Sequence, residues 1–151
     1  MRFEELAFVC QEAARDLVAR ETRPLPVVVV LPGPRATRLV RIPDWPDDES
    51  ARLALLSALA HDEILSTSTP AYGFLAEAEI GAAEDVLLVV YGAHDRPPHV
   101  TAAPFADGEL GEFLEAEPLD PDALSFLRPL QHAVDAVRVA PAPPGIPGFG
   151  A

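Results

Sequence analysis

The stretch 51–65 (ARLALLSALAHDEIL) most constrains how this chain can fold, because it reads as a helix with very little polar surface. Between Ala51 and Ala60 only Arg52 and Ser57 are polar. A surface helix normally has one apolar stripe and a charged opposite face, whereas a helix that is apolar nearly all round is buried on more than one side. A single sheet cannot cover the leucines of this helix, which point in several directions: Leu53, Leu55, Leu56 and Leu59.

A second copy of the chain is the simplest source of the additional cover, because most oligomers are symmetric assemblies of identical chains. We therefore predict a homodimer whose interface includes Leu53, Leu56 and Leu59. Which of these three side chains faces the partner depends on how the helix is rotated on its own sheet, and the sequence leaves that open.

Hydrophobic periodicity predicts an α+β chain with the element order α-β-β-α-β-β-β-α. The continuous apolar runs 27–31 and 86–91 indicate strands covered on both faces, whereas the alternating run 72–80 predicts a half-exposed strand. Pro129 predicts a kink or break in the last helix. The remaining expected elements are a helix at 2–20, strands at 37–42 and 99–105, and a last helix from the Asp120-Pro121-Asp122 cap to about residue 138.

These strands predict a single five-stranded antiparallel sheet with helices on both faces and the strand order 2-1-5-4-3. This order puts the two most apolar runs inside the sheet. It leaves at the edges one strand with Arg38 and Arg41 and one strand with Glu77 and Glu79, where charge discourages pairing with other chains. The arrangement resembles the roadblock or profilin-like sandwich in topology, without a shared motif, so the resemblance implies a fold and no function.

The charge of the chain is strongly negative and unevenly distributed. The formal net charge is −13, all 11 basic residues are arginine, and there is no lysine. Residues 1–52 hold 8 arginines against 9 acidic residues, and residues 53–151 hold 3 against 15. Such a surface repels nucleic acids and anionic membranes, so we expect neither as a partner. A partner chosen by charge would be a basic protein, although acidity alone also keeps a protein in solution.

The length fits one domain, which we place at 1–139, followed by a Pro/Gly-rich tail at 140–151. Cys10 is the sole cysteine and lies in the apolar stripe of the first helix, so we expect a buried, inert thiol. The chain shows neither a signal-peptide pattern nor a long apolar span, and together with the single cysteine this favours a cytoplasmic location. We expect Ile146 and Phe149 of the tail to dock against the domain or a second copy.

Three groups of residues could carry chemistry. His94, Asp95 and His99 flank a predicted hairpin turn and could hold a metal, but a solvated turn explains them better. Glu77 and Glu79 could act as paired carboxylates, and an exposed charged edge strand explains them as well. The group 61–63 (His-Asp-Glu) ends the central helix, where the helix dipole favours a histidine. Nucleophile-elbow, phosphate-loop, C-x-x-C and H-E-x-x-H motifs are absent, so we expect no cofactor and no metal.

Two classes of function remain. The first is a non-enzymatic, acidic, homodimeric interaction module, an adaptor or chaperone-like protein whose main partner is itself. The second is a small-molecule-binding protein or enzyme with a pocket near the 92–99 turn, close to Tyr72, His94 and His99. Polar groups converging in a closed cavity would favour the second class, and an exposed apolar face would favour the first.

Overall fold

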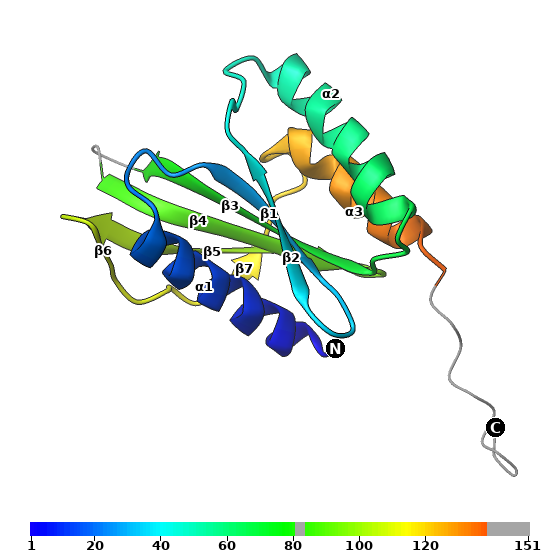
Figure 1. Cartoon of the computed structure of the whole chain (residues 1–151), viewed down its shortest axis with the longest axis horizontal. Helices are drawn as coiled ribbons and strands as arrows, with labels where there is room; N and C mark the ends of the chain where they lie inside the picture. The colour runs from blue at the N-terminus through cyan, green and yellow to red at the C-terminus, as the bar shows by residue number, and fades with distance from the viewer. Residues whose placement is uncertain (81–83, 139–151) are drawn as a thin grey trace, which may run out of the picture.

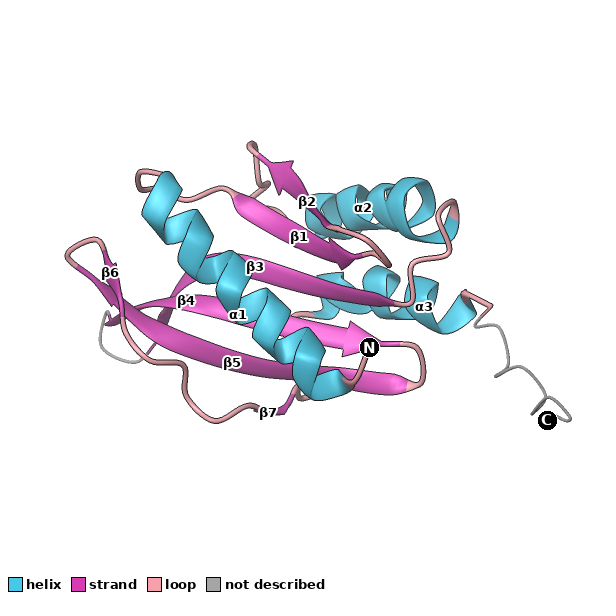
Figure 2. Ribbon diagram, turned by 60° about the horizontal axis from the view of Figure 1, so that its bottom comes forward, coloured by secondary structure: helices cyan, strands magenta, loops and turns pink. Residues whose placement is uncertain are grey.

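A sheet covered by helices on both faces organises the chain, as Figures 1 and 2 show. The computed structural model describes residues 1–80, with only the backbone of residue 80, and residues 84–138. Helix α1 (Phe3–Arg20) lies across one face of the sheet, and α2 (Glu49–Leu59) and α3 (Arg128–Ala136) lie on the other. The described residues therefore form an α+β fold in three layers, which confirms the predicted class and the helices on both faces.

The sheet is antiparallel throughout and has the order β2-β1-β3-β4-β5-β6, with β7 also paired to β5. Two short helical turns adjoin the α-helices: a π-helical turn (η1, Ala60–Leu65) continues α2, and a 3₁₀ turn (η2, Ser125–Leu127) precedes α3. The strands are β1 (Val27–Pro32), β2 (Thr37–Ile42), β3 (Ala71–Ile80), β4 (Glu84–Ala93), β5 (Arg96–Ala106), β6 (Glu109–Leu110) and β7 (Glu117–Pro118).

Each face of the sheet has its own hydrophobic core. Under α1, a stripe at helical spacing meets alternate residues of the central strands, and its members are Leu6, Cys10, Ala14 and Leu17. On the opposite face, Leu56 of α2 and Leu130 of α3 are fully buried against Val29 and Phe74 of the sheet. All six residues of β1 are buried, as its continuous apolar run predicted.

The predicted strand order is wrong, because β1 pairs with β3 and not with β5. The strand with Glu77 and Glu79 therefore lies inside the sheet and not at its edge. Its first half, 71–75, is buried on both faces. The alternation in the sequence comes partly from Gly73, over which Cys10 of α1 packs so closely that an added Cβ would overlap the sulfur. Gly73 thus contributes to an alternating pattern typical of a half-exposed strand, although it is a glycine because α1 packs closely on it.

Prolines explain why β5 lies farther out than expected. Pro97, Pro98 and Pro104 have no N–H to donate to a ladder, so a strand containing them suits an incompletely paired edge. The chain then folds back and covers this edge through β6, β7 and the Leu114 N–H, which donates to the Ala102 carbonyl at 2.9 Å. With these two short strands the sheet has seven strands and not five, and the roadblock or profilin-like resemblance loses its basis, since it rested on the predicted order.

The last helix begins later than its cap sequence predicted. The Asp120 carboxylate accepts a hydrogen bond from the Asp122 N–H at 2.9 Å, but the residues that follow form a turn and not the first turn of a helix. Leu124 then adopts a left-handed conformation with φ 50°, which ends any continuous helix there. Pro129 lies in the first turn of α3, where its missing N–H is harmless, so it stands at the beginning of the helix and not at a kink or break within it.

Two further expectations concern the C-terminal tail and the presence of a membrane-spanning helix. The tail and its predicted docking through Ile146 and Phe149 fall outside the described residues. Within the described part, no helix has both the length and the apolar character needed to cross a bilayer.

The contact between Gly73 and Cys10 gives a stability prediction. Gly73→Ala should lower the free energy of unfolding by about 1–3 kcal/mol, the usual cost of overpacking a core. In a Cys10→Ala background the same change should cost less than about 1 kcal/mol, because the overlapping sulfur is gone. Chemical denaturation of the four proteins measures both values. Gly111→Ala is the matched control, since an added Cβ there is 3.4 Å from its nearest neighbour. An equal cost in both backgrounds would contradict the packing argument.

Candidate functional site

Helix α2 presents an outer face whose exposed positions between Glu49 and Asp62 include no Asp, Glu or Arg. Asp48 caps the helix by accepting a hydrogen bond from the Ala51 N–H at 2.8 Å. Leu56 and Leu59 are buried in the chain's own core, at 0% and 9% exposure, whereas Leu53 is 44% exposed. The exposed positions along this face, from the first turn of α2 into η1, are Ser50, Leu53, Ala54, Ser57, Ala58, His61 and Leu65. Of the three predicted interface leucines, the fold therefore leaves only Leu53 accessible to a partner.

A shallow groove adjoins Leu53 on the side of α3. It has a volume of ≈ 520 Å³, and its lining includes Phe126, Pro129 and His132 together with the charged residues Glu49 and Arg128. The Ser125 hydroxyl donates to a Glu49 carboxylate oxygen at 3.1 Å and joins the two helices at one end. The groove and the exposed leucine together form a surface with a hollow and a projection, which we call the α2 face, and its charged members are Glu49 and Arg128 at the groove.

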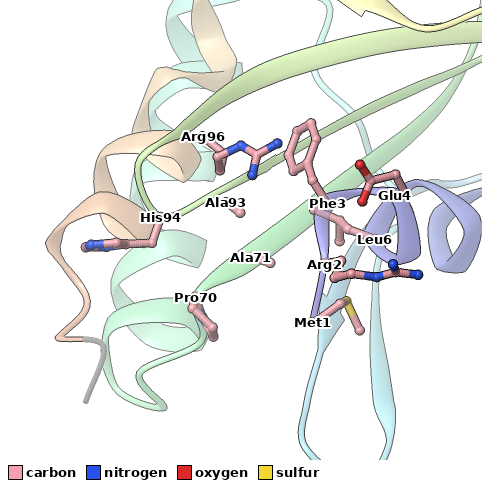
Figure 3. Close-up of a pocket in the computed structure, with 10 residues that line it drawn as sticks. All are labelled: Met1, Arg2, Phe3, Glu4, Leu6, Pro70, Ala71, Ala93, His94 and Arg96. Carbon is pink, nitrogen blue, oxygen red and sulfur yellow. The ribbon is translucent and has the colours of Figure 1, made fainter. Parts of the chain in front are cut away.

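The turn between β4 and β5 separates two other pockets. The larger, of ≈ 510 Å³, opens where α1 begins, and Figure 3 shows its lining residues. Its apolar lining includes Leu6 together with Ala71 and Ala93, which face each other across β3 and β4. The Arg96 guanidinium carbon lies 4.5 Å from the centre of the Phe3 ring at one wall. The pocket is open and its volume lies within the range of small-molecule sites.

The histidines of the turn do not converge. His94 donates from Nδ1 to the Val134 carbonyl oxygen at 3.0 Å and points away from Phe3 in Figure 3. His99 lies on the α1 side, with its ring 5.1 Å from that of Phe3 and 6.1 Å from that of Tyr91. Among the described residues, no three His, Cys, Asp or Glu side chains form a group able to hold a metal ion. Residues 81–83 and 139–151 contain none of these four residue types.

Gln131 of α3 is a hydrogen-bonding hub that the sequence did not reveal. Its Nε2 donates to the carbonyl oxygens of Ala93 at 3.0 Å and Arg96 at 3.3 Å. Its Oε1 accepts the hydroxyl of Tyr72 at 3.1 Å. A side chain at Gly92 would overlap Gln131, so this glycine in a central strand was the available signal. The hub fixes the turn and forms one wall of the second pocket, of ≈ 240 Å³.

Glu77 has a structural role. Its carboxylate accepts hydrogen bonds from Arg23 Nε and from the Leu25 N–H, both at 2.6 Å, and thereby fastens the loop after α1 to the sheet. Arg23 also reaches Asp85 at 3.1 Å. Glu79 is exposed and takes no part in this network. Of the two carboxylates that could have formed an acid–base pair, Glu77 is therefore engaged in these hydrogen bonds, while Glu79 lies beside it in the same open pocket.

Comparisons with known proteins add no assignment. No family model, no curated protein and no solved structure matches this chain. The geometry of the molecule is therefore the basis for any functional inference.

Burial of two ionisable groups predicts a loss of stability at alkaline pH. Burial raises the pKa of the Cys10 thiol from 9.0 to about 12. Burial, and to a smaller extent the negative charge of Asp135, raises the pKa of Tyr72 above 10.0. Each group stays protonated in the native state while it ionises in the unfolded chain. The free energy of unfolding should therefore fall above about pH 9, by at most ~1.4 kcal/mol per pH unit for each group.

Two variants separate these contributions. Cys10→Ala should remove the fall that begins near pH 9, and Tyr72→Phe should remove the contribution of Tyr72 to the fall that begins near pH 10, where burial raises the pKa of Tyr91 as well. Denaturant titrations between pH 7 and pH 11 measure the slopes. If the Cys10→Ala profile had the slope of the unmodified protein throughout, the buried thiol would not be the cause.

Proposed function

We propose that this protein is a non-enzymatic interaction module that forms a homodimer through the α2 face. The observation that carries the proposal is the 44% exposure of Leu53 in a stretch of exposed helix positions, between Glu49 and Asp62, that has no Asp, Glu or Arg. The chain as a whole is rich in charge, with 35 Asp, Glu and Arg residues among 151. A run of exposed positions without Asp, Glu or Arg around an exposed leucine therefore stands out on this molecule, and depletion of charge around an apolar side chain is typical of protein contacts.

The shape of the α2 face suits a symmetric contact. In a twofold dimer the same patch meets itself, so a projection on one copy must fit a hollow on the other. Leu53 supplies the projection, and the groove lined by Phe126, Pro129 and His132 supplies the hollow. The exposed side chains Ala54 and Ala58 on the same helix are small and allow two helices to approach closely.

A substitution at Leu53 tests the proposal. Leu53→Asp places a charge at the centre of the α2 face and should convert a dimer to a monomer, with the dissociation constant raised at least about a hundredfold. Because Leu53 belongs to no buried core, the melting temperature of the monomer should remain close to that of the unmodified chain at low concentration. Light scattering coupled to size-exclusion chromatography measures the mass.

A control uses a more exposed leucine elsewhere on the chain. Leu114→Asp, at a side chain 61% exposed in the 111–116 loop, should leave the mass unchanged. Salt gives a second criterion, because two copies of charge −13 repel each other and screening should strengthen an apolar dimer. A monomeric unmodified protein at all concentrations, or a dimer unaffected by Leu53→Asp, would refute the proposed interface.

A second candidate function is supported by the pocket of Figure 3. A small molecule held beside the turn would contact the apolar floor at Ala71 and Ala93 and the guanidinium of Arg96. Native mass spectrometry of the freshly purified protein would detect such a molecule as an added mass. Ala93→Leu, which enlarges a floor side chain, should remove that mass, whereas Leu53→Asp should retain it. An unliganded mass for the unmodified protein argues against this candidate.

A further inference from the structure

The two edges of the sheet differ in whether another segment of the chain covers them. The outer edge of β5 is covered by the chain's own segment 109–119, through β6, β7 and the Leu114 N–H. Strand β2 is the other outermost strand, and all six of its residues pair with β1. No element in 1–80 or 84–138 pairs with its outer edge. A regular edge strand of this kind can accept an additional strand.

The register shows which backbone groups point outward from β2. The Gly33 N–H donates to the Ala36 carbonyl at 3.0 Å and closes the hairpin. Hydrogen-bonded and non-hydrogen-bonded pairs alternate along an antiparallel ladder, so Arg38 and Val40 bond to β1. The N–H and C=O groups of Thr37, Leu39 and Arg41 therefore point away from the sheet, and all three residues are exposed.

The side chains along this edge are basic in an otherwise acidic protein. Residues 35–42 (RATRLVRI) contain three arginines and no carboxylate. Arg38 pairs with Glu63 at 2.5 Å and Arg41 with Glu21 at 2.6 Å, through N–H groups at the ends of the two guanidinium groups. Arg35 is exposed on the hairpin and makes no ion pair with a described residue. The edge thus keeps an excess of positive charge and donors for further carboxylates.

We propose that the outer edge of β2 binds an extended, acidic segment of a partner protein as an added strand. A second copy of this chain suits the edge poorly, because two antiparallel β2 strands would bring their arginines together. Residues 140–151 suit it poorly too, since they contain four prolines and no acidic residue. An acidic strand satisfies the outward backbone groups and adds carboxylates to the arginines.

Two labelled peptides test the preference for acidic strands. The probes are acetyl-EVTVEVTVE-amide and the peptide in which every Glu is Lys, each carrying fluorescein, and fluorescence anisotropy measures binding to the whole chain. The acidic peptide should bind at least about tenfold more tightly. The net charge of −13 attracts the basic peptide to the rest of the surface, so only a local contact can reverse that order. Equal or tighter binding of the basic peptide would overturn the proposal.

A proline at the edge tests the backbone contact. Leu39→Pro removes an outward N–H without removing a bond to β1, and it should weaken acidic-peptide binding about tenfold. Leu39→Ala, which keeps the N–H, should change binding by less than about threefold. Equal effects of the two variants would argue against strand addition. Leu53→Asp should leave this binding unchanged, which separates the edge from the α2 face.

Amide hydrogen exchange on the unmodified chain gives the same answer without a variant that could unfold. Saturating acidic peptide should slow exchange of the Thr37, Leu39 and Arg41 amides at least about tenfold, while Val40 is already protected by β1. Protection confined to other regions would place the peptide elsewhere and overturn the assignment. Protection of the same amides that grows with protein concentration in the absence of peptide would instead assign the edge to a second copy.

Discussion

Burial of strands β1 and β3 on both faces is the constraint on which the rest of the structure depends. Residues 27–32 have no exposed member, and neither do residues 71–75. Apolar strands of this kind cannot be covered by one layer, so α1 must lie on one face and α2 with α3 on the other. The close approach of Cys10 to Gly73 shows how closely α1 packs on the sheet.

The second layer is held by polar contacts as well as by packing. Gln131 ties α3 to the carbonyl groups of the β4–β5 turn and to Tyr72, and His94 returns a hydrogen bond to Val134. Both pockets beside this turn therefore have walls fixed by the same contacts. The polar groups of the hub bond to one another and so maintain the shape of the turn. Arg96, which lies against Phe3 of α1, contributes positive charge to the larger pocket.

Local pattern determined what could be predicted and non-local packing determined what could not. The first helix, the first two strands and the central helix follow from periodicity, proline positions and the Asp48 cap, all of which are local signals. The strand order depends on which faces are covered by helices distant in sequence, and nothing in the sequence near Gly73 shows that Cys10 of α1 packs on it. The three prolines of β5 indicate an edge position, whereas the predicted order rests on the apolar runs 27–31 and 86–91 and on the two charged strands.

The candidate surfaces illustrate the same division. Excess apolar character in residues 51–65 indicated a contact surface, yet only the rotation of α2 on the sheet distinguishes the exposed Leu53 from the buried Leu56 and Leu59. The β2 edge and the end of this helix are also physically joined, because Arg38 bonds to both the carboxylate and the carbonyl oxygen of Glu63. Glu63 lies in the π-helical turn that continues α2, and π-helical turns often occur at functional sites. A carboxylate arriving at Arg38 would compete with Glu63, so the edge of the sheet and the end of the α2 face share one ion pair.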